Sequence, residues 1–334
     1  MTVLFRVSDK SQDEALLDRG REVIRIEAEA LHRLDDSLDG SFIDACRIIL
    51  AATRRIVVTG MGKSGHIGRK LAATLSATGT PAMFIHPAEA GHGDLGMLMA
   101  GDVLLVLSNS GNTTELRAIL DYARGMHIKI IGVASHRASL VMDFADVAIC
   151  LPTLREACAA NIAPTTSTTL QLALGDAMAL AVMDARGISK TRLRALHPAG
   201  TIGMRLTPIS ELMHVGDQIP LVAAGTGMPD VISVMTRCRF GLAGVVNDRG
   251  ELIGAVTDGD LRRHFSELNS ASAGDVMTSP PKSIASEMLA SDALMFLNDA
   301  KITAAFVVNR LDTLSPTRPV GIVHIHDLLQ YGLN

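Results

Sequence analysis

Residues 58–69 read V-T-G-M-G-K-S-G-H-I-G-R, and this stretch decides the fold of the first half of the chain. An apolar run at 56–59 leads into the glycines and a helical pattern follows them, which predicts a buried strand, a tight turn and a helix N-terminus. Gly60, Gly62 and Gly65 match the G-x-G-x-x-G pattern of dinucleotide-binding folds, and Gly62-Lys63-Ser64 resembles the end of a P-loop. Both patterns allow a phosphate to approach the backbone closely at a helix N-terminus. The stretch therefore predicts a ligand that carries phosphate.

Two departures count against a nucleotide at this turn. A P-loop requires a glycine at position 57, which is Val57 here. A dinucleotide fold requires an acidic residue at the end of the second strand, but that strand ends in F-I-H-P and Glu89 comes only later. A nicotinamide-dependent dehydrogenase stays as an alternative, and absence of nicotinamide binding by fluorescence would dispose of it.

The composition excludes several classes of protein. The 334 residues are 48% apolar, enough for two domains with buried cores. Aromatic residues are only 3%, the net charge is −4 and no Lys/Arg stripe is present, so a nucleic-acid partner is not expected. The four cysteines form no C-x-x-C pair, and His92 with Asp94 is too small a set for a metal, so neither a metal nor a cofactor is predicted. With no signal peptide and no apolar stretch near about 20 residues, we expect a cytoplasmic protein without a membrane span.

The first half alternates between strands and helices. Apolar runs predict strands at 56–59, 82–85, 103–107, 128–133 and 146–151. Helical patterns separate or follow them at 65–78, 113–124, 138–144 and 167–186. This alternation predicts an α/β fold with a parallel, doubly wound sheet covered on both faces. Ligands of such a fold bind beyond the carboxyl ends of the strands, in the loops 60–65, 86–96, 108–113 and 152–166.

Two helices are predicted before the first strand. Residues 11–39 have a helical pattern whose expected buried positions are Leu16, Leu17, Ile24, Leu31 and Leu34. Residues 41–53 form the second pattern, and Ser41 with Asp44 gives it a weak capping signal.

The composition shifts near 205–210, and the remainder holds a weak internal repeat. E-L-M-H-V-G at 211–216 resembles D-V-M-T-S-P at 275–280, and G-A-V-T-D-G-D-L-R at 254–262 resembles G-I-V-H-I-H-D-L-L at 321–329. Each copy has the pattern helix, strand, strand, helix. The predicted organisation is a first domain over 1–208, with an N-terminal helical segment over about 1–40, and two repeats over 209–271 and 272–334.

Hydroxyl and amide side chains gather in three of the strand-end loops. The loop L-S-N-S-G-N-T-T-E at 107–115 and the run A-P-T-T-S-T-T-L at 163–170 each open a helix, and Ser64 adds a hydroxyl from the first loop. Hydroxyls around a helix N-terminus bind phosphate, although an ordinary capping turn would use the same residues. The predicted phosphate contacts are Ser64, Ser108, Asn109, Ser110, Thr113, Thr165 and Thr166.

Several titratable residues lie in or next to the same loops. They are Lys63, His86, Glu89, His92, Asp94, Glu115 and Glu156, and His197 follows the long helix. A single such residue is usually solvated, but several on the ligand-facing rim of one sheet are candidates for acid–base chemistry.

Taken in order, these motifs resemble the D-arabinose 5-phosphate isomerase family over essentially the whole chain. They are G-M-G-K-S-G-H-I-G, H-P-A-E-A-G-H-G-D-L-G, S-N-S-G, E-A-C, A-P-T-T-S-T-T and H-P-A-G, and the repeats resemble tandem CBS domains. The resemblance implies a flavodoxin-like sugar isomerase (SIS) domain followed by two CBS α+β repeats. It implies interconversion of D-ribulose 5-phosphate and D-arabinose 5-phosphate, the first step toward the lipopolysaccharide or capsule sugar Kdo. It also implies a homotetramer that needs no metal.

The resemblance also implies the active-site residues, which are Lys63, His92, Glu115, Glu156 and His197. We expect Glu156 to shuttle the proton of a cis-enediol mechanism, with Glu115 as the alternative, provided that burial raises the carboxylate pKa. His197 would open the sugar ring, Lys63 would stabilise the enediolate or the phosphate, and His92 would contact a substrate oxygen. Asn112 and residues 159–162 depart from the family pattern in loops that should border the site.

For the repeats, the resemblance implies a nucleotide site with Thr257 and Asp260 in the first copy and Asp327 in the second, where His324 replaces the hydroxyl residue. Candidate ligands are adenosine nucleotides or CMP-Kdo, and a pair that serves only assembly is an equal alternative. Two alternatives remain for the first domain. One is an SIS isomerase of a hexulose or heptose phosphate, and the other is a sugar-phosphate sensor without catalysis.

Overall fold

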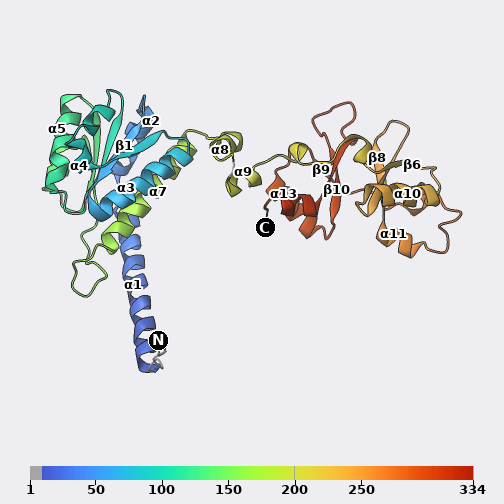
Figure 1. The fold of residues 1–334 in the computed structure, drawn as a ribbon, viewed down its shortest axis with the longest axis horizontal. Helices are drawn as coiled ribbons and strands as arrows, with labels where there is room; N and C mark the ends of the chain where they lie inside the picture. Colours follow the sequence, from blue (N-terminus) through green and yellow to red (C-terminus); the bar gives the residue numbers. More distant parts are fainter. Residues whose placement is uncertain (1–9, 199, 334) are drawn as a thin grey trace, which may run out of the picture. The chain divides into compact units, whose positions relative to one another are not determined.

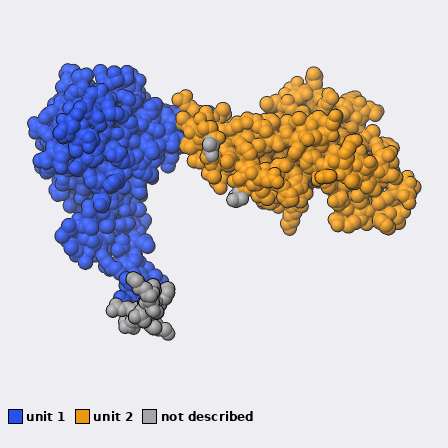
Figure 2. Space-filling view, viewed as in Figure 1, with its two compact units in different colours: residues 1–189 blue, residues 190–334 orange. Residues whose placement is uncertain are grey.

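The computed structural model describes residues 10–198 and 200–333, which divide into two compact units after Ser189 (Figures 1 and 2). The first unit is a sheet with helices on both faces, and the second contains the two repeats. The division falls before the boundary expected at 208, since the short helices α8 (Lys190–Leu196) and α9 (Thr201–Arg205) belong to the second unit.

The five predicted strands form one parallel sheet with the order β2-β1-β3-β4-β5. The strands are β1 (Ile56–Gly60), β2 (Ala82–Ile85), β3 (Val103–Leu107), β4 (Lys129–Ala134) and β5 (Val147–Cys150). Every residue of β1 and β3 is buried, as expected for a parallel sheet covered on both faces. This order is that of a doubly wound, flavodoxin-like fold, and the predicted fold class is confirmed.

Successive strand residues enter opposite cores because side chains alternate across a strand. Val58 joins the core under α1 (Lys10–Ser37), α2 (Gly40–Ala51), α3 (Gly62–Ala77) and α7 (Thr166–Ala185). Val57 joins the core on the opposite face. The helices there are α4 (Pro87–Ala90), α5 (Arg117–Gly125) and α6 (Leu140–Phe144), with the 3₁₀ turns η1 (Asp94–Met97) and η2 (Thr114–Leu116).

The expected buried face of α1 is wrong for most of its length. Leu34 is buried, but Leu16, Leu17, Ile24 and Leu31 are exposed, with exposed fractions of 67%, 55%, 69% and 36%. Figure 1 shows the reason, since the N-terminal half of α1 extends beyond the sheet, and the residues of α1 that enter the core, Ala30 and Leu34, lie in its later turns. The capping signal of the next helix is also wrong, because α2 is capped by Asp39, whose carboxylate accepts from the Ser41 backbone at 2.8 Å.

The second unit holds two repeats of strand, helix, strand, strand and helix, each with a leading strand that the sequence pattern missed. The first has β6 (Leu221–Ala223), α10 (Met228–Cys238), β7 (Leu242–Val246), β8 (Leu252–Thr257) and α11 (Asp258–Arg263). The second has β9 (Ser283–Ala285), α13 (Ala290–Asp299), β10 (Ala304–Val308), β11 (Pro319–His324) and α14 (Ile325–Gln330). The three-residue β6 and β9 are too short for an apolar period to reveal them.

The segment that opens each repeat crosses to the sheet of the other. His214 bridges to Ile322 of β11, and Thr278, after α12 (Ala273–Val276), bridges to Ala255 of β8. The 3₁₀ turns η3 (Ile209–Glu211) and η4 (Gly216–Gln218) flank the first of these segments, and Ile209 is buried in the core of the second repeat. The two repeats therefore fold as one interlocked pair.

Candidate active site

The topology brings the two most polar strand-end loops together. β1 lies between β2 and β3, and Gly60 pairs with Leu107 where β1 and β3 end. The loops after these two strands therefore leave the same edge of the sheet side by side, at the point where the strand order reverses. The predicted contacts Lys63 and Ser64 come from one loop, and Ser108 to Thr113 come from the other.

The glycines of the opening stretch have identifiable structural roles. Gly62 has a φ of +56°, a left-handed conformation that favours glycine. A Cβ atom on Gly65 would lie 2.5 Å from the Gly60 carbonyl oxygen, so only glycine lets α3 pack this closely on β1. The helix begins at Gly62 and not at the predicted residue 65, which puts Lys63 and Ser64 in its first turn. Its N-cap residue, Met61, offers no side-chain acceptor, so this N-terminus is suited to an anion.

The loop after β3 is built around Ser108. Its buried hydroxyl accepts from the Gly111 backbone at 3.1 Å and lies 3.1 Å from the Thr113 hydroxyl. Gly111 has a φ of +70°, and a Cβ atom there would lie 2.2 Å from the Ser139 hydroxyl. Ser110 is exposed, and its hydroxyl accepts from the Asn112 backbone at 3.2 Å.

The two asparagines of this loop hold neighbouring elements. The side-chain oxygen of Asn109, Oδ1, accepts a hydrogen bond from the Ser135 hydroxyl at 2.6 Å, which connects the loop to the end of β4. The side-chain oxygen of Asn112, Oδ1, accepts a hydrogen bond from the backbone N–H of Leu140 at 2.9 Å, at the start of α6. Asn112, which departs from the family pattern, therefore connects the loop to α6.

His92 and Glu115 are both exposed, and they come from adjoining elements. His92 follows α4, Glu115 lies in η2, and α4 packs against η2. The Glu115 carboxylate accepts one hydrogen bond, from the Thr114 hydroxyl at 3.1 Å. His86 occupies the N-cap position of α4, but its imidazole makes no capping hydrogen bond. The Nδ1 atom of this imidazole is buried and has no hydrogen-bond partner.

Glu156 is buried against the N-terminus of α7. One carboxylate oxygen accepts from the Thr165 backbone at 2.7 Å, the Ser167 backbone at 3.2 Å and the Thr165 hydroxyl at 3.2 Å. Burial disfavours the ionised form, but the hydrogen bonds from Ser167 and Thr165 outweigh it and hold the Glu156 pKa below its ordinary value. The expectation that burial would raise this pKa is therefore wrong. Glu156 acts as the acceptor for a helix whose own N-cap, Thr165, makes no capping bond.

Two further residues, one in the loop after Glu156 and one in α7, are absent from the predicted site residues. Asn161, in the stretch that departs from the family pattern, has a φ of +54° and its carbonyl oxygen accepts from the Glu156 backbone at 2.6 Å. Gln171 is fully buried in α7, and neither atom of its carboxamide has a partner. The sequence signal for Gln171 is a glutamine within the mostly apolar segment 170–182, which indicates a buried polar side chain. Thr166, a predicted phosphate contact, is also buried with an unpartnered hydroxyl.

His197 belongs to the second unit, in the turn between α8 and α9, and its Nδ1 lies 2.8 Å from the Leu193 carbonyl oxygen. Over residues 10–198 and 200–333, no three His, Cys, Asp or Glu side chains are arranged to hold a metal ion. Within the same described residues, no helix has the length and apolar character needed to cross a bilayer.

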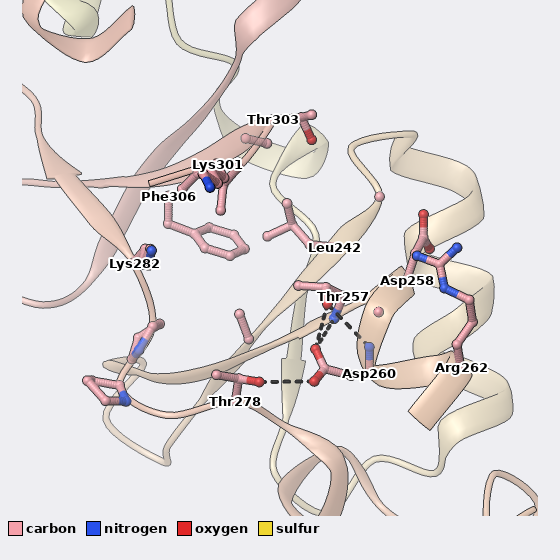
Figure 3. Close-up of a pocket in the computed structure, with 17 residues that line it drawn as sticks. Leu242, Thr257, Asp258, Asp260, Arg262, Thr278, Lys282, Lys301, Thr303 and Phe306 are labelled. Carbon is pink, nitrogen blue, oxygen red and sulfur yellow. Dashed lines mark hydrogen bonds between the residues drawn. The ribbon is translucent and has the colours of Figure 1, made fainter. Parts of the chain in front are cut away.

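The second unit contains a further cavity, of about 500 Å³, between its two repeats (Figure 3). Thr257 and Asp260 form the capping box of α11 at its wall, and the Thr278 hydroxyl donates to Asp260 at 2.9 Å. Burial opposes ionisation of Asp260, but hydrogen bonds from Thr257, Thr278 and Arg263 hold its pKa below the ordinary value. Lys282 and Lys301 line the same cavity and supply positive charge. Asp327, the counterpart of Asp260, caps α14 together with His324.

The family comparisons agree with both halves of the chain. The SIS domain family matches residues 49–181, and the CBS domain family matches residues 209–267 and 273–334. Arabinose 5-phosphate isomerase KdsD of Pseudomonas aeruginosa is 40% identical over 97% of this chain and 99% of its own length. The proteins of the same name from Yersinia pestis and Escherichia coli K12 are 40% and 38% identical, each over 94% of this chain and 95% of their own length.

Solved structures resemble the first unit. An E. coli CFT073 protein in complex with arabinose 5-phosphate is 33% identical with a TM-score of 0.54, and it covers 57% of this chain and 100% of its own. A putative sugar-phosphate isomerase of Listeria monocytogenes is 30% identical with a TM-score of 0.55 and the same coverage. Because the identity to the curated isomerases extends over nearly the full length of both chains, this chain belongs to the arabinose 5-phosphate isomerase family, enzymes with an SIS domain and a pair of CBS domains.

Proposed function

We propose that this isomerase interconverts D-ribulose 5-phosphate and D-arabinose 5-phosphate through a cis-enediol, and that its product supplies the synthesis of Kdo for lipopolysaccharide or capsule. The observation that carries this proposal is the pair of phosphate-suited loops at the strand-order reversal, where the open N-terminus of α3 meets the hydroxyl-rich loop after β3. The arabinose 5-phosphate that accompanies the similar E. coli structure supports a pentose phosphate as the ligand.

The phosphate group would bind between Ser64 in the first turn of α3 and the loop that holds Ser108, Ser110 and Thr113. Backbone N–H groups and hydroxyls at a helix N-terminus favour a doubly charged anion. Lys63 is exposed beside Ser64, so its ammonium would neutralise either the phosphate or the oxygen that becomes negative in the enediolate. An anchored phosphate fixes the small sugar in register with the acid–base groups.

We assign the proton shuttle to Glu115 and a positioning role to Glu156. A carboxylate that accepts three hydrogen bonds is stabilised in its ionised form, which makes Glu156 a weaker base. Glu115 accepts a single side-chain hydrogen bond from its neighbour and is exposed at the rim of the sheet. Glu156 would instead hold the N-terminus of α7, and with it Thr165 and Thr166, in the conformation that the substrate requires.

His197 and His92 would complete the chemistry. Arabinose 5-phosphate closes to a furanose, so the ring must open before the proton moves, and His197 is assigned as the acid–base group for that step. Its second nitrogen, Nε2, is available because Nδ1 lies against the Leu193 carbonyl oxygen. His92, exposed beside the elements that carry Glu115, would contact a substrate hydroxyl.

The test is a coupled assay on the purified chain with pentose, hexose and heptose phosphates. We expect turnover of ribulose 5-phosphate and arabinose 5-phosphate at catalytic efficiencies about 10–200-fold above those of the longer sugars, since an extra or missing group in a fitted site costs about 1–3 kcal/mol. If the enzyme instead prefers a hexulose or heptose phosphate, it is an SIS isomerase that acts on that longer sugar phosphate. Binding without turnover would favour a sensor.

For the CBS pair, we propose that the cavity of Figure 3 binds a nucleotide or CMP-Kdo. Its volume of about 500 Å³ suits a small nucleotide, Asp260 offers acceptors for sugar hydroxyls, and Lys282 and Lys301 match a phosphate. A screen of AMP, ATP and CMP-Kdo by thermal shift should raise the Tm with at least one of them. No shift with any of the three would favour a pair that serves only assembly.

We also propose a cytoplasmic homotetramer. The exposed apolar side chains of α1, among them Leu16, Leu17 and Ile24, support burial against another copy, because three large apolar side chains on one helix are left in water otherwise.

A further inference from the structure

The two CBS copies carry corresponding sites with different chemistry. In the first copy, the Asp260 carboxylate accepts from the hydroxyls of Thr257 at 2.6 Å and Thr278 at 2.9 Å, as Figure 3 shows. The internal repeat aligns Asp260 with Asp327, which keeps the carboxylate in the second copy. Its surroundings have no such hydroxyl at the matching positions.

Imidazoles replace both hydroxyl groups in the second copy. His324 stands where the first copy has Thr257, and His214 stands where it has Thr278, with the same bridge to the neighbouring strand. The His214 Nε2 atom lies 3.0 Å from the Asp327 carboxylate. A third histidine, His326, replaces Gly259, and its ring centroid lies 4.7 Å from that of His324. One imidazole, that of His214, therefore contacts the carboxylate, and the rings of His324 and His326 lie beside each other at the same helix N-terminus. We call His214, His324, His326 and Asp327 the histidine cluster.

His324 has a structural role that depends on its protonation state. Its Nδ1 accepts from the His326 backbone at 3.1 Å, while its own backbone N–H donates to Asp327 at 3.0 Å, so an imidazole serves as the N-cap of α14. An imidazole nitrogen accepts a hydrogen bond only when it carries no proton. A proton on this Nδ1 turns the acceptor into a donor that faces another N–H group, and the cap is lost.

We propose that the histidine cluster is a proton-responsive site, in which protonation of His324 releases the N-terminus of α14 and loosens the end of the second CBS copy formed by β11 and α14. In the first copy the capping hydroxyl of Thr257 does not titrate near neutral pH, so only one of the two copies responds. The second copy therefore has titratable histidines at the positions where the first copy has the hydroxyl groups that contact Asp260.

The surroundings determine when this proton binds. Burial opposes the charged form of His324, the charges of His326 and His214 oppose it further, and Asp327 favours it, so its pKa lies below the ordinary value of 6.5. Phe240 covers the cluster, with ring centroids 5.1 Å from His214 and 6.3 Å from His324. Two charged residues, Asp217 and Arg237, line the adjacent cavity of about 670 Å³ together with His214.

A metal ion is a poorer occupant for the cluster. The described residues contain no group of three His, Cys, Asp or Glu side chains with the geometry of a metal site. In the cluster, His324 Nδ1 already accepts from the backbone and His214 Nε2 already faces Asp327.

The sign of the effect follows from linkage. A histidine whose folded pKa is depressed stabilises the fold above its unfolded pKa, near 6.5, and this contribution is lost as the pH falls through the folded value. We therefore expect the second copy to open more readily below about pH 6.5, while the first copy does not change in the same range.

Hydrogen exchange of the full chain tests this, with rates corrected for intrinsic exchange at about pH 7.5, 6.5 and 5.5. Protection of peptides from 319–333 should fall by up to about tenfold per unit of pKa difference, and protection of the matching peptides from 252–265 should stay constant. His324→Thr, which restores the residue of the first copy, should abolish the response. His326→Gly, which restores Gly259, should move its midpoint to higher pH, because a repelling charge is removed.

The matched control is His264→Thr, which alters a first-copy histidine whose imidazole pairs with Glu267 and accepts from no helix N-terminus. It should leave the response of 319–333 unchanged. Equal responses of the two copies would overturn the proposal, as would an unaltered response in both His324→Thr and His326→Gly. Protection of 319–333 by added Zn²⁺ at neutral pH would replace it by a metal site.

Discussion

At the scale of single residues, the two carboxylates predicted for the active site, Glu115 and Glu156, differ in the hydrogen bonds that they accept. Glu156 accepts hydrogen bonds from Thr165 and Ser167, whereas Glu115 accepts one from its neighbour Thr114. The same functional group therefore serves as a helix acceptor at one position and remains available for proton transfer at the other. Mutation of each carboxylate should separate these roles, because one affects the fold and the other affects only chemistry.

We expect Glu115→Gln to lower kcat by about 10²–10⁴-fold, the contribution of a general base, with an unchanged Tm. Glu156→Gln should also lower activity, but it should cost about 0.5–2 kcal/mol of stability, the range for loss of a helix cap. Paired measurements of steady-state kinetics and thermal unfolding distinguish the two. A near-normal kcat of Glu115→Gln would contradict this assignment and indicate that Glu156 is the base that transfers the proton.

The stabilisation by Glu156 should depend on pH in a defined direction. Its folded pKa lies below the ordinary value of 4.5, so its contribution is present above about pH 4.5 and is lost as the pH falls through the folded pKa. The free energy of unfolding of wild type and Glu156→Gln should therefore differ near neutral pH and converge in acid. Denaturant unfolding across this range is the measurement. A difference that stays constant with pH would show that the ionised carboxylate does not stabilise α7.

At the scale of elements, the junction of β1 and α3 depends on a close approach that only glycine permits. A Cβ atom on Gly65 would lie 2.5 Å from the Gly60 carbonyl oxygen, and because this neighbour is backbone and not a flexible side chain, it cannot easily move aside. The N-terminus of α3 would then shift away from β1. Since Lys63 and Ser64 lie in that first turn, the packing of Gly65 would also affect the proposed binding of the substrate phosphate.

Gly65→Ala should therefore destabilise the chain by about 1–3 kcal/mol, as overpacking does, and raise KM for the sugar phosphate. Gly125→Ala is the matched control, because that glycine ends α5, and a Cβ atom placed on it would meet no other atom within 4 Å. Chemical denaturation and steady-state kinetics of both variants provide the comparison. Equal behaviour of the two variants would contradict the role given to Gly65.

The elements differ in how far the sequence predicted them. The predicted bounds of the five strands differ from the observed ones by at most one residue at each end, because a parallel strand covered on both faces is a continuous apolar run between turn residues. The buried face of α1 could not be predicted, since periodicity shows that a helix has an apolar face but not whether its own chain covers that face. The role of Glu156 was hidden for a related reason, because its partners lie nine to eleven residues away and meet it only when the loop closes.

At the scale of the whole molecule, the exposed side chains of α1 bear on assembly. Leu16, Leu17 and Ile24 are each more than half exposed on a helix whose N-terminal half extends beyond the sheet, so their burial requires another surface. Arg19 on the same helix donates to the Ala157 carbonyl oxygen, beside Glu156. Assembly through α1 would therefore also stabilise the loop that holds Ala157 and Glu156.

The double variant Leu17→Ser/Ile24→Ser should lower the oligomer mass, because it removes apolar surface whose burial contributes about 1.5–3 kcal/mol per side chain. Activity should fall with it and recover in part at high protein concentration, since assembly follows mass action. Leu311→Ser/Leu314→Ser is the matched control, with two leucines that are 77% and 90% exposed in a loop of the second unit. Sedimentation velocity over a concentration series measures the mass, and parallel assays measure the activity. An α1 variant that keeps the wild-type mass would leave this helix outside the interface, and dissociation of the control would locate the interface in the second unit.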